Sequence, residues 1–295
     1  MLRYSLVEVV PKRYRISSMP TIPFTKMHGA GNDFVVIDLR EHPVILSESG
    51  IAAMADRHKG IGCDQIVVID FPQLDSDIRF RFYNSDGSES GACGNGTRCA
   101  ASKIMREENR RTLSIETLAK VVTANMRPDG SVTVDMGLPE TEWRKIPLAY
   151  EVNTLYLPIN LGPLMDATGV NVGNPHCVFF VEDADAIDIN YYGPIVASHK
   201  LFPESTNVEF VSKLSDGRLR MRVWERGVGV SLACGTGVCA ALVSAALRGI
   251  INGRSAEFIV DGGLLSANWR EDDHIFLNGP VATSFYGVYK NSCKL

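Results

Sequence analysis

The pattern of apolar positions predicts many short strands along the chain. Three runs are continuous and rich in β-branched or aromatic residues, which is typical of strands buried on both faces; they are residues 34–37, 66–69 and 177–181. Two further runs, 78–83 and 219–224, alternate between apolar and charged or polar residues, as half-buried strands do. We therefore expect a fold in which sheet structure dominates.

A hairpin and three helices complete the predicted elements. Segments 120–126 and 131–136 flank the turn sequence Arg127-Pro-Asp-Gly130, and this arrangement predicts a hairpin. The helical candidates are Ser49 to His58, Gly94 to Glu108 and Gly235 to Gly249. Many strands combined with a few helices are typical of the α+β class.

The two halves of the chain repeat the same short motifs in the same order. The clearest pair is Cys-Gly-x-Gly, which begins at Cys93 and again 141 positions later at Cys234 (234 − 93). Two other pairs recur at almost the same distance: Gly31-Asn32 with Gly173-Asn174, and Asp64 to Val67 with Thr206 to Glu209. A nearly constant offset indicates a duplicated domain of about 140 residues.

This repeat also predicts the domain boundaries. The first domain comprises residues 22–136 together with 280–295, because the C-terminal strand is expected to return to it, and the second comprises 137–279. Residues 1–21 are an N-terminal extension. Its apolar part is interrupted by Glu8 and ends at Pro11, which argues against a secretory signal peptide. A start at Met19 is an alternative that leaves the two domains unchanged.

Composition narrows the range of functions. The 295 residues carry 30 Lys and Arg against 34 Asp and Glu, a formal net charge of −4. This mildly acidic balance without basic runs argues against nucleic acid as a partner. No apolar stretch approaches the roughly 20 residues of a membrane-spanning helix, so we expect no membrane association. The 7 cysteines include no Cys-x-x-Cys spacing, so free thiols in a reducing compartment such as the cytoplasm are expected.

Each Cys-Gly-x-Gly motif precedes a predicted helix. A cysteine at a helix N-terminus meets unpaired backbone N–H groups and the positive end of the helix dipole, and this environment lowers the pKa of a thiol. The glycines let a ligand approach the backbone, where the N–H groups can hold a carboxylate. The opposed thiols of Cys93 and Cys234 suit inversion at a carbon acid, in which one group removes the α-proton and the other returns a proton to the opposite face.

These motifs resemble those of the diaminopimelate epimerases. The segment Asn84-Ser-Asp-Gly-Ser-Glu-Ser-Gly-Ala-Cys-Gly-Asn-Gly-Thr-Arg98 matches the family's first cysteine motif, N-x-D-G-S-x4-C-G-N-G-x-R, at every fixed position. The segments that resemble its second cysteine motif, its opening and its mid-chain motif are Glu225 to Gly237, Lys26 to Phe34 and Gly173 to Cys177. One small departure is Ser231, where many members have Thr. The resemblance implies two pseudo-symmetric domains, each a mixed sheet or barrel wrapped round a central helix, with the active site in the cleft between them.

The resemblance also implies roles for the matching residues. Cys93 and Cys234 would be the acid/base pair, and His176 and Glu225 would tune their protonation. The reacting end of the substrate would be handled by Asn32, Gln65 and Glu225, and its α-carboxylate by the backbone of Gly94, Asn95, Gly235 and Thr236. The distal amino-acid end would be read by Asn84, Asn174, Asn207 and Arg226. A buried Arg without an anion is costly, so Arg226 in particular favours a substrate with a second charged end.

The implied activity is the interconversion of LL- and meso-diaminopimelate, a precursor of lysine and peptidoglycan, by an enzyme without a cofactor or metal. A homodimer is compatible with this interpretation. A racemase for proline or hydroxyproline is an alternative, although that branch resembles Cys-Gly-His-Gly where Asn95 stands here. A non-catalytic amino-acid-binding protein and a thiol redox protein are alternatives from other classes. A binding protein would not need both cysteines, and a redox protein is disfavoured because this sequence lacks Cys-x-x-Cys.

Overall fold

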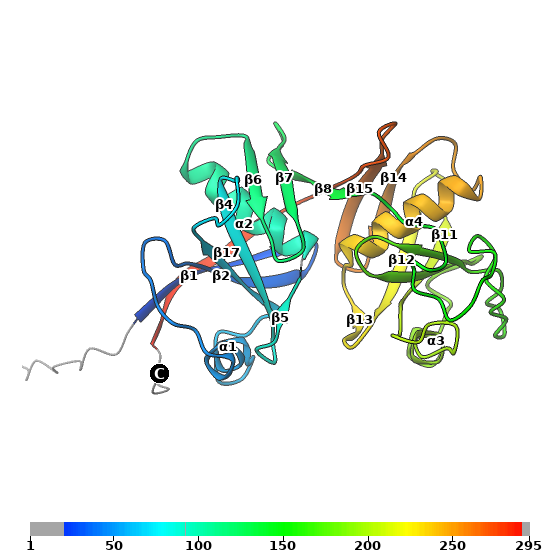
Figure 1. Ribbon diagram of the computed structural model, residues 1–295, viewed down its shortest axis with the longest axis horizontal. Coiled ribbons are helices and arrows are strands. Elements are labelled where there is room, and N and C mark those ends of the chain that lie inside the picture. The colour runs from blue at the N-terminus through cyan, green and yellow to red at the C-terminus, as the bar shows by residue number, and fades with distance from the viewer. Residues whose placement is uncertain (1–20, 92, 291–295) are drawn as a thin grey trace, which may run out of the picture.

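The protein consists of two lobes of similar architecture, each with one long helix at its centre (Figure 1). The computed structural model describes residues 21–91 and 93–290. The predicted N-terminal extension therefore lies outside the described residues except for Thr21, which is the first residue of a strand. Within the described ranges, each helix is too short or too polar to span a bilayer.

The first lobe is built from residues near both ends of the described chain. Its elements in chain order are β1 (Thr21–Gly29), β2 (Asn32–Asp38), α1 (Glu48–Ala55), β3 (Gln65–Asp70), β4 (Ile78–Asn84), β5 (Glu89–Ser90), α2 (Gly94–Glu107), β6 (Thr112–Glu116), β7 (Val121–Met126), β8 (Val132–Gly137) and β17 (Ala282–Lys290). Strand β17 pairs antiparallel with β1, so the last strand closes the first lobe. The predicted hairpin is present as β7 and β8.

The second lobe repeats this order of elements. It contains β9 (Thr168–Asn171), β10 (Pro175–Phe180), α3 (Ile189–Ala197), β11 (Asn207–Lys213), β12 (Leu219–Glu225), β13 (Gly229–Ser231), α4 (Gly235–Leu247), β14 (Ser255–Val260), β15 (Gly263–Trp269) and β16 (Ile275–Gly279). Strand β16 pairs antiparallel with β8 of the first lobe, so a continuous ladder of backbone hydrogen bonds joins the two lobes.

Strand registers prove the internal repeat. In the first lobe β2 runs parallel to β3 with Phe34 opposite Gln65, and in the second β10 runs parallel to β11 with His176 opposite Asn207. Each of these pairs is followed by an antiparallel strand, β4 or β12. The predicted duplicated α+β architecture is therefore confirmed.

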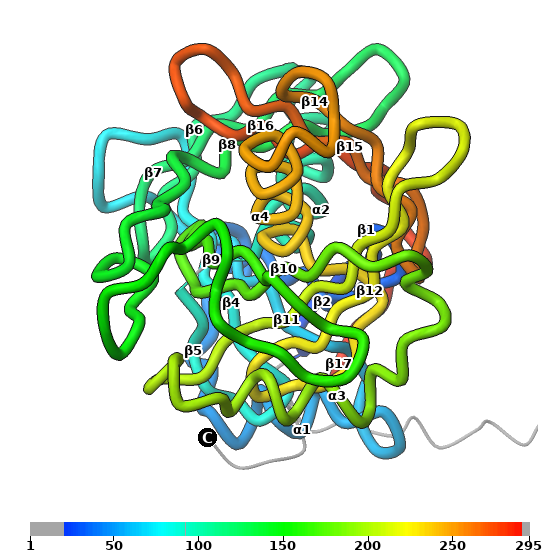
Figure 2. Tube along the Cα trace, turned by 90° about the vertical axis from the view of Figure 1, so that its right-hand side faces the viewer, coloured from blue at the N-terminus to red at the C-terminus, as the bar shows by residue number. Residues whose placement is uncertain are grey.

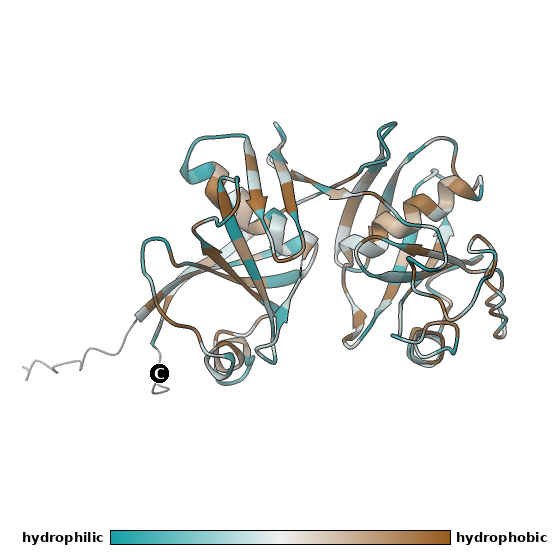
Figure 3. Ribbon diagram, in the orientation of Figure 1, coloured by the Kyte–Doolittle hydropathy of each residue, from teal (hydrophilic) through white to brown (hydrophobic). Residues whose placement is uncertain are grey.

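Alternation along the continuous apolar strands explains why both sheet faces are covered. In β2, Phe34 and Val36 pack in the cluster that contains α2, whereas Val35 and Ile37 pack against α1 on the other face. The second lobe follows the same rule, with α4 on one face and α3 on the other. Hydrophobic colour accordingly concentrates on the strands and on α4, and hydrophilic colour on the outer loops (Figure 3).

The two central helices begin at the junction of the lobes. Figure 2, seen from the side of the second lobe, shows α4 in front of α2 with the strands arranged around them. Both helices begin at a Gly that follows Cys, as predicted. A Cβ placed on Gly235 would lie 4.0 Å from the Cα of Gly94, so the two N-termini meet. Buried Leu277 packs against both glycines, which leaves no room for larger residues there.

Candidate active site

A cleft of about 1850 Å³ lies where the two helix N-termini meet. Both lobes line it. It contains almost the whole set of site residues predicted from the sequence: Asn32, Gln65, Asn84, Cys93, Gly94, Asn95, Asn174, Asn207, Glu225, Arg226, Cys234, Gly235 and Thr236. His176 is the exception, because it is fully buried behind the wall of the cleft. Residues far apart in the sequence therefore form one site.

The two thiols hold equivalent positions at the ends of the helices. Cys93 is the N-cap of α2, and its Sγ accepts a hydrogen bond of 3.4 Å from the N–H of Gly96. Cys234 is the N-cap of α4 and accepts a bond of the same length from Gly237. Since the first N–H groups of a helix have no partner within it, both termini offer donors to a carboxylate in the cleft.

The expectation of lowered thiol pKa values was wrong. Burial raises the pKa of Cys93 to about 11, although the Gly96 N–H counteracts this. Burial also raises the pKa of Cys234 well above its ordinary value, and the nearby carboxylates of Glu225 and Glu209 raise it further. The cost of placing a charged thiolate in a low-dielectric site thus exceeds the stabilisation by the helix terminus. A thiolate formed here is a strong base for the weakly acidic proton of a carbon acid.

Asn95 connects the two cysteine loops. Its Nδ2 donates to the carbonyl of Ala233, the residue before Cys234, at 3.0 Å, and to Oδ1 of Asn32 at 3.2 Å. Its Oδ1 accepts from Nη2 of Arg98 at 2.8 Å. Asn95 is itself buried, so these bonds hold the loops of both lobes in one arrangement.

The remaining polar residues of the first lobe are held by one another. Nε2 of Gln65 donates to Oδ1 of Asn84 at 2.9 Å. Nδ2 of Asn32 donates to a carboxylate oxygen of Asp64 at 2.7 Å. Each of these amides keeps further donor or acceptor capacity toward the cleft. The first-lobe wall thus combines neutral amides with the carboxylate of Asp64, which also lines the cleft.

In the second lobe, a buried pair of hydrogen-bonded side chains supports the wall of the cleft. Nδ1 of His176 lies 2.7 Å from Oε1 of Glu209, and both side chains are fully buried. Nε2 of His176 lies 2.9 Å from Oδ1 of Asn174, which lines the cleft. Asn207 is buried too, and its amide bridges the carbonyl of Pro175 and the N–H of Arg226.

Arg226 lines the cleft, but it is not buried. Its side chain is exposed, and Nη1 donates to the carbonyl of Glu204 at 3.0 Å. The argument that a buried Arg226 requires an anion therefore does not hold. An exposed guanidinium at the rim can still bind a carboxylate in bidentate fashion. Glu225, its neighbour, lies deeper, and burial raises the pKa of its carboxyl group.

Comparisons with known proteins agree on one family. The sequence pattern of diaminopimelate epimerase matches residues 24–142 and 168–283. A diaminopimelate epimerase from Rhodospirillum centenum is 50% identical over 265 residues, which are 90% of this chain and 91% of the relative. Another from Acidiphilium cryptum is 48% identical over 266 residues, with 90% and 95% covered. The chain belongs to the diaminopimelate epimerase family. It is accordingly an isomerase.

Solved structures with low sequence identity share the fold of this family member. A phenazine biosynthesis protein of the PhzF family from Bacillus anthracis has a TM-score of 0.67 at 16% identity, with 92% of this chain and 99% of that chain covered. A hydroxyproline epimerase from Agrobacterium vitis, solved with bound trans-4-hydroxy-L-proline, has a TM-score of 0.65 at 13% identity, with 92% and 93% covered. At such identity the likeness concerns the fold alone.

Three residues in or behind the cleft were not predicted from the sequence. Arg98 is fully buried, and its Nε and Nη1 have no hydrogen-bond partner among the described residues. Glu209 was part of a repeat motif without a role. Asp64 lies next to Gln65 and anchors Asn32. The sequence signal for Arg98 was its place in the long cysteine motif. The signal for Glu209 was that it is a single carboxylate within the apolar run of β11.

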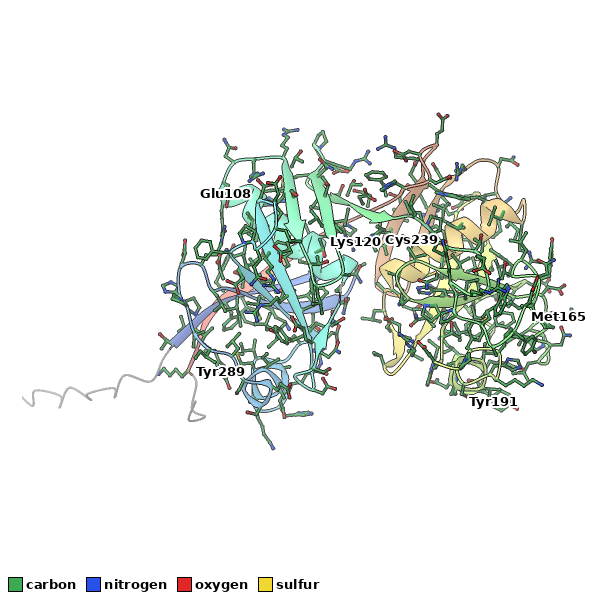
Figure 4. All side chains as sticks on the ribbon, viewed as in Figure 1. Glu108, Lys120, Met165, Tyr191, Cys239 and Tyr289 are labelled. Atoms are coloured by element: carbon green, nitrogen blue, oxygen red, sulfur yellow. The ribbon has the colours of Figure 1, made fainter. Side chains whose placement is uncertain are left out.

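The described residues contain no group of three or more His, Cys, Asp or Glu side chains arranged to hold a metal ion. The four cysteines of the two central helices, two at the N-caps and two further along, do not gather in one cluster. Cys99 and Cys239 are fully buried and do not line the cleft, whereas Cys93 and Cys234 do. Figure 4 shows Cys239 of the second lobe close to Lys120 of the first, at the upper part of the junction.

Proposed function

We propose that this chain interconverts LL- and meso-diaminopimelate by a two-base mechanism that uses Cys93 and Cys234. The observation that carries the proposal is the meeting of two N-capping thiols, one from each lobe, at one cleft whose walls carry amides, carboxylates and an arginine. A substrate with an amino acid at each end meets donors and acceptors at both ends of such a cleft.

The reaction inverts one α-carbon. The thiolate of one cysteine removes the α-proton, so that the S–H bond forms as the C–H bond breaks and the electron pair is delocalised into the α-carboxylate. The first-turn N–H groups of α2 and α4, at Gly94, Asn95, Gly235 and Thr236, stabilise the negative charge that develops there. The thiol of the other cysteine then gives its proton to the opposite face of the carbon. The first cysteine leaves as a thiol and the second as a thiolate, which is the state required for the reverse reaction.

The amide side chains divide between the two ends of the substrate. Asn32, Gln65 and Glu225 bind the α-amino group and its surroundings, since each offers an acceptor oxygen. Glu225 and His176 set the protonation of the thiols. The distal amino and carboxylate groups are bound by Asn84, Asn174, Asn207 and Arg226. The position of Arg226 at the rim favours a second carboxylate, which a proline-type substrate lacks.

The proposal extends to the setting of the enzyme. The two-base mechanism includes no step that uses a metal, nicotinamide or pyridoxal phosphate. The product serves lysine and peptidoglycan synthesis in the cytoplasm. The working form is a homodimer. The outer surface of β17 supports this, because it exposes Phe285, Tyr286 and Val288 and because β1 is its one partner among the described strands. Sedimentation at micromolar concentration checks the dimer.

Solvent deuterium incorporation tests the function. The wild type should exchange and epimerise the α-proton of LL-diaminopimelate and should act on proline or lysine at least about 10⁴-fold less efficiently, because a site built to bind a second charged end rejects substrates without it. Arg226→Met should raise KM for diaminopimelate while leaving both thiols reactive. Turnover of proline as efficient as that of diaminopimelate would contradict the proposed function in favour of a racemase.

A further inference from the structure

The buried pair of His176 and Glu209 lies outside the cleft and has no assigned purpose beyond the tuning role of the histidine. Both side chains are fully buried. One carboxylate oxygen of Glu209 faces Nδ1 of His176 at 2.7 Å, and the other, Oε2, has no hydrogen-bond partner among the described residues. A buried carboxylate with half of its acceptors unused is expensive. Such a group requires an explanation other than stability.

The internal repeat shows that the fold does not need this pair. The strand registers place His176 and Glu209 where the first lobe has Phe34 and Val67. The equivalence extends to packing. A Cβ on Gly96 in α2 would lie 3.2 Å from the Cγ2 of Val67, and a Cβ on Gly237 in α4 would lie 2.8 Å from Oε1 of Glu209. The same backbone supports its helix terminus with hydrocarbon in one lobe and with a carboxylate in the other.

The carboxylate of Glu209 influences the cleft in two ways, through a chain of contacts and through its charge. The first is a chain of contacts from Oε1 of Glu209 to Nδ1 of His176 and from Nε2 of His176 to Oδ1 of Asn174, which lines the cleft. Both ring nitrogens of His176 are thus held by oxygen atoms, which fixes the orientation of the ring and of the Asn174 amide. This orientation leaves the Nδ2 group of Asn174 available as a donor.

The second way is electrostatic. The titratable groups that interact with Glu209 are His176 and Cys177 on β10, Glu225 on β12 and Cys234 at the start of α4. The charge of Glu209 raises the pKa of both Glu225 and Cys234. At the first thiol the corresponding wall is apolar, and the charge on Arg98 lowers the pKa of Cys93. The two thiols therefore differ in their tendency to hold a proton.

We propose that Glu209 is a positioning residue of the epimerase reaction, which orients His176 and through it Asn174, and which places behind Cys234 a carboxylate that has no counterpart behind Cys93. This inference rests on the proposed function, since it explains a difference between the two bases of that mechanism. Glu209 itself neither touches the substrate nor exchanges a proton with it. It breaks the symmetry that the duplication would otherwise impose on the two bases.

Glu209→Gln tests the charge while retaining an acceptor for Nδ1 of His176. We expect kcat/KM for LL-diaminopimelate to fall about 10- to 100-fold, as for the loss of one charge-assisted hydrogen bond. The alkylation of Cys234 by iodoacetamide, followed by peptide mass spectrometry across pH, should begin at lower pH than in the wild type, whereas that of Cys93 should not move. Unchanged kcat/KM together with an unchanged Cys234 profile would overturn the proposal.

The double variant His176→Phe/Glu209→Val covers the case in which the single variant does not fold. It rebuilds the apolar wall of the first lobe, and replacement of a buried pair by hydrocarbon of suitable shape is tolerated. We expect a melting temperature at or above that of the wild type, combined with a loss of at least about 10-fold in kcat/KM. A double variant with wild-type kcat/KM would show that the pair has no part in the reaction.

A matched control separates the charge of Glu209 from the removal of any buried carboxylate. Glu116 is also buried, but it accepts from the N–H groups of Gln73 and Leu74 and does not itself line the cleft. Glu116→Gln should lower stability without changing either alkylation profile. The wild type reports separately on the proposed function: if it fails to epimerise diaminopimelate while Glu209→Gln still shifts the Cys234 profile, the substrate is wrong and the asymmetry of the thiols stands.

Discussion

The two lobes of the molecule share a backbone frame but differ in the wall beneath each central helix. Under the N-terminus of α2, Gly96 packs against Phe34, Val67 and Phe82. Under the N-terminus of α4, the same register contains His176, Glu209 and Val223. Two positions have thus changed from apolar to ionisable. The comparison teaches that the duplication supplies the geometry of two opposed thiols, whereas their chemical difference comes from a few side chains behind them.

A second difference lies within the helices. Counted from each N-capping cysteine, Arg98 of α2 and Cys239 of α4 occupy the same position, five residues on (98 − 93 and 239 − 234). Both are fully buried. The guanidinium of Arg98 lies against Gly29 and Gly279, where a Cβ would come within 3.3 Å and 3.1 Å of it. The first lobe therefore contributes a positive charge near the junction, and the second contributes the carboxylates of Glu225 and Glu209.

The largest effect is expected from breaking either half of the thiol pair. Cys93→Ala and Cys234→Ala should each lower the rate of epimerisation by at least about 10³-fold, because inversion needs a group on both faces. Each variant keeps one thiol, which can still remove and return a proton on its own face. Deuterium exchange without inversion should then persist for one stereoisomer only, and the two variants should differ in which one.

Matched controls for this comparison are present one turn or so further along each helix. Cys99→Ala and Cys239→Ala remove buried thiols that do not line the cleft. They should lower the melting temperature slightly and leave kcat within about threefold of the wild type. If Cys93→Ala epimerised diaminopimelate at near-normal rates, the two-base mechanism would be refuted.

A smaller effect is expected from removing the positive charge of the first lobe. Arg98→Met keeps most of the side-chain volume but removes a buried charge without a carboxylate partner among the described residues, so the free energy of unfolding should stay constant or rise. Activity should move in the opposite direction. Asn95 loses the donor at 2.8 Å that orients its amide toward Ala233, and kcat/KM should fall by about tenfold. Chemical denaturation and steady-state kinetics on the same preparation measure both. Lower stability with full activity would show that Arg98 is purely structural.

Much of the frame of this site could be predicted from the sequence because it depends on local rules. A Cys-Gly-x-Gly motif before a helical segment indicates an N-terminus, and α2 and α4 begin where predicted. Alternation and continuous apolar runs predicted the core strands. By contrast, α3 was missed, since Pro194 lies within it and interrupts the pattern of a helix. The predicted helix from Ser49 ends earlier than expected, at Ala55.

The electrostatics of the site could not be predicted in the same way. Whether a thiol at a helix N-terminus has a low or high pKa depends on its burial, and the burial of Cys234 arises only from the packing of the folded chain. The burial of Arg98 and Arg226 also depends on tertiary packing, because the sequence marks both only as charged. Arg98 is enclosed by Gly29, which lies 69 positions earlier in the chain (98 − 29), and by Gly279. Arg226, by contrast, is exposed at the rim of the cleft. Tertiary packing left Arg226 exposed, against the expectation, and buried Arg98, whose burial no sequence pattern had indicated.

The smallest expected effect concerns the pH dependence of the first thiol. Burial raises the pKa of Cys93 to about 11, so at pH 8 the thiol is almost entirely protonated in the free enzyme. Its rate of alkylation by iodoacetamide should rise about tenfold per pH unit between pH 8 and 10, since the thiolate is the nucleophile. The ionised carboxylate of Glu225 raises the pKa of both thiols, so Glu225→Gln should lower both midpoints, by less than about one unit. Glu209→Gln, in contrast, should move the midpoint of Cys234 alone. A Cys93 midpoint near 8.5, the ordinary value of a free thiol, would show that burial does not control this site and would remove the physical basis for the difference between the lobes.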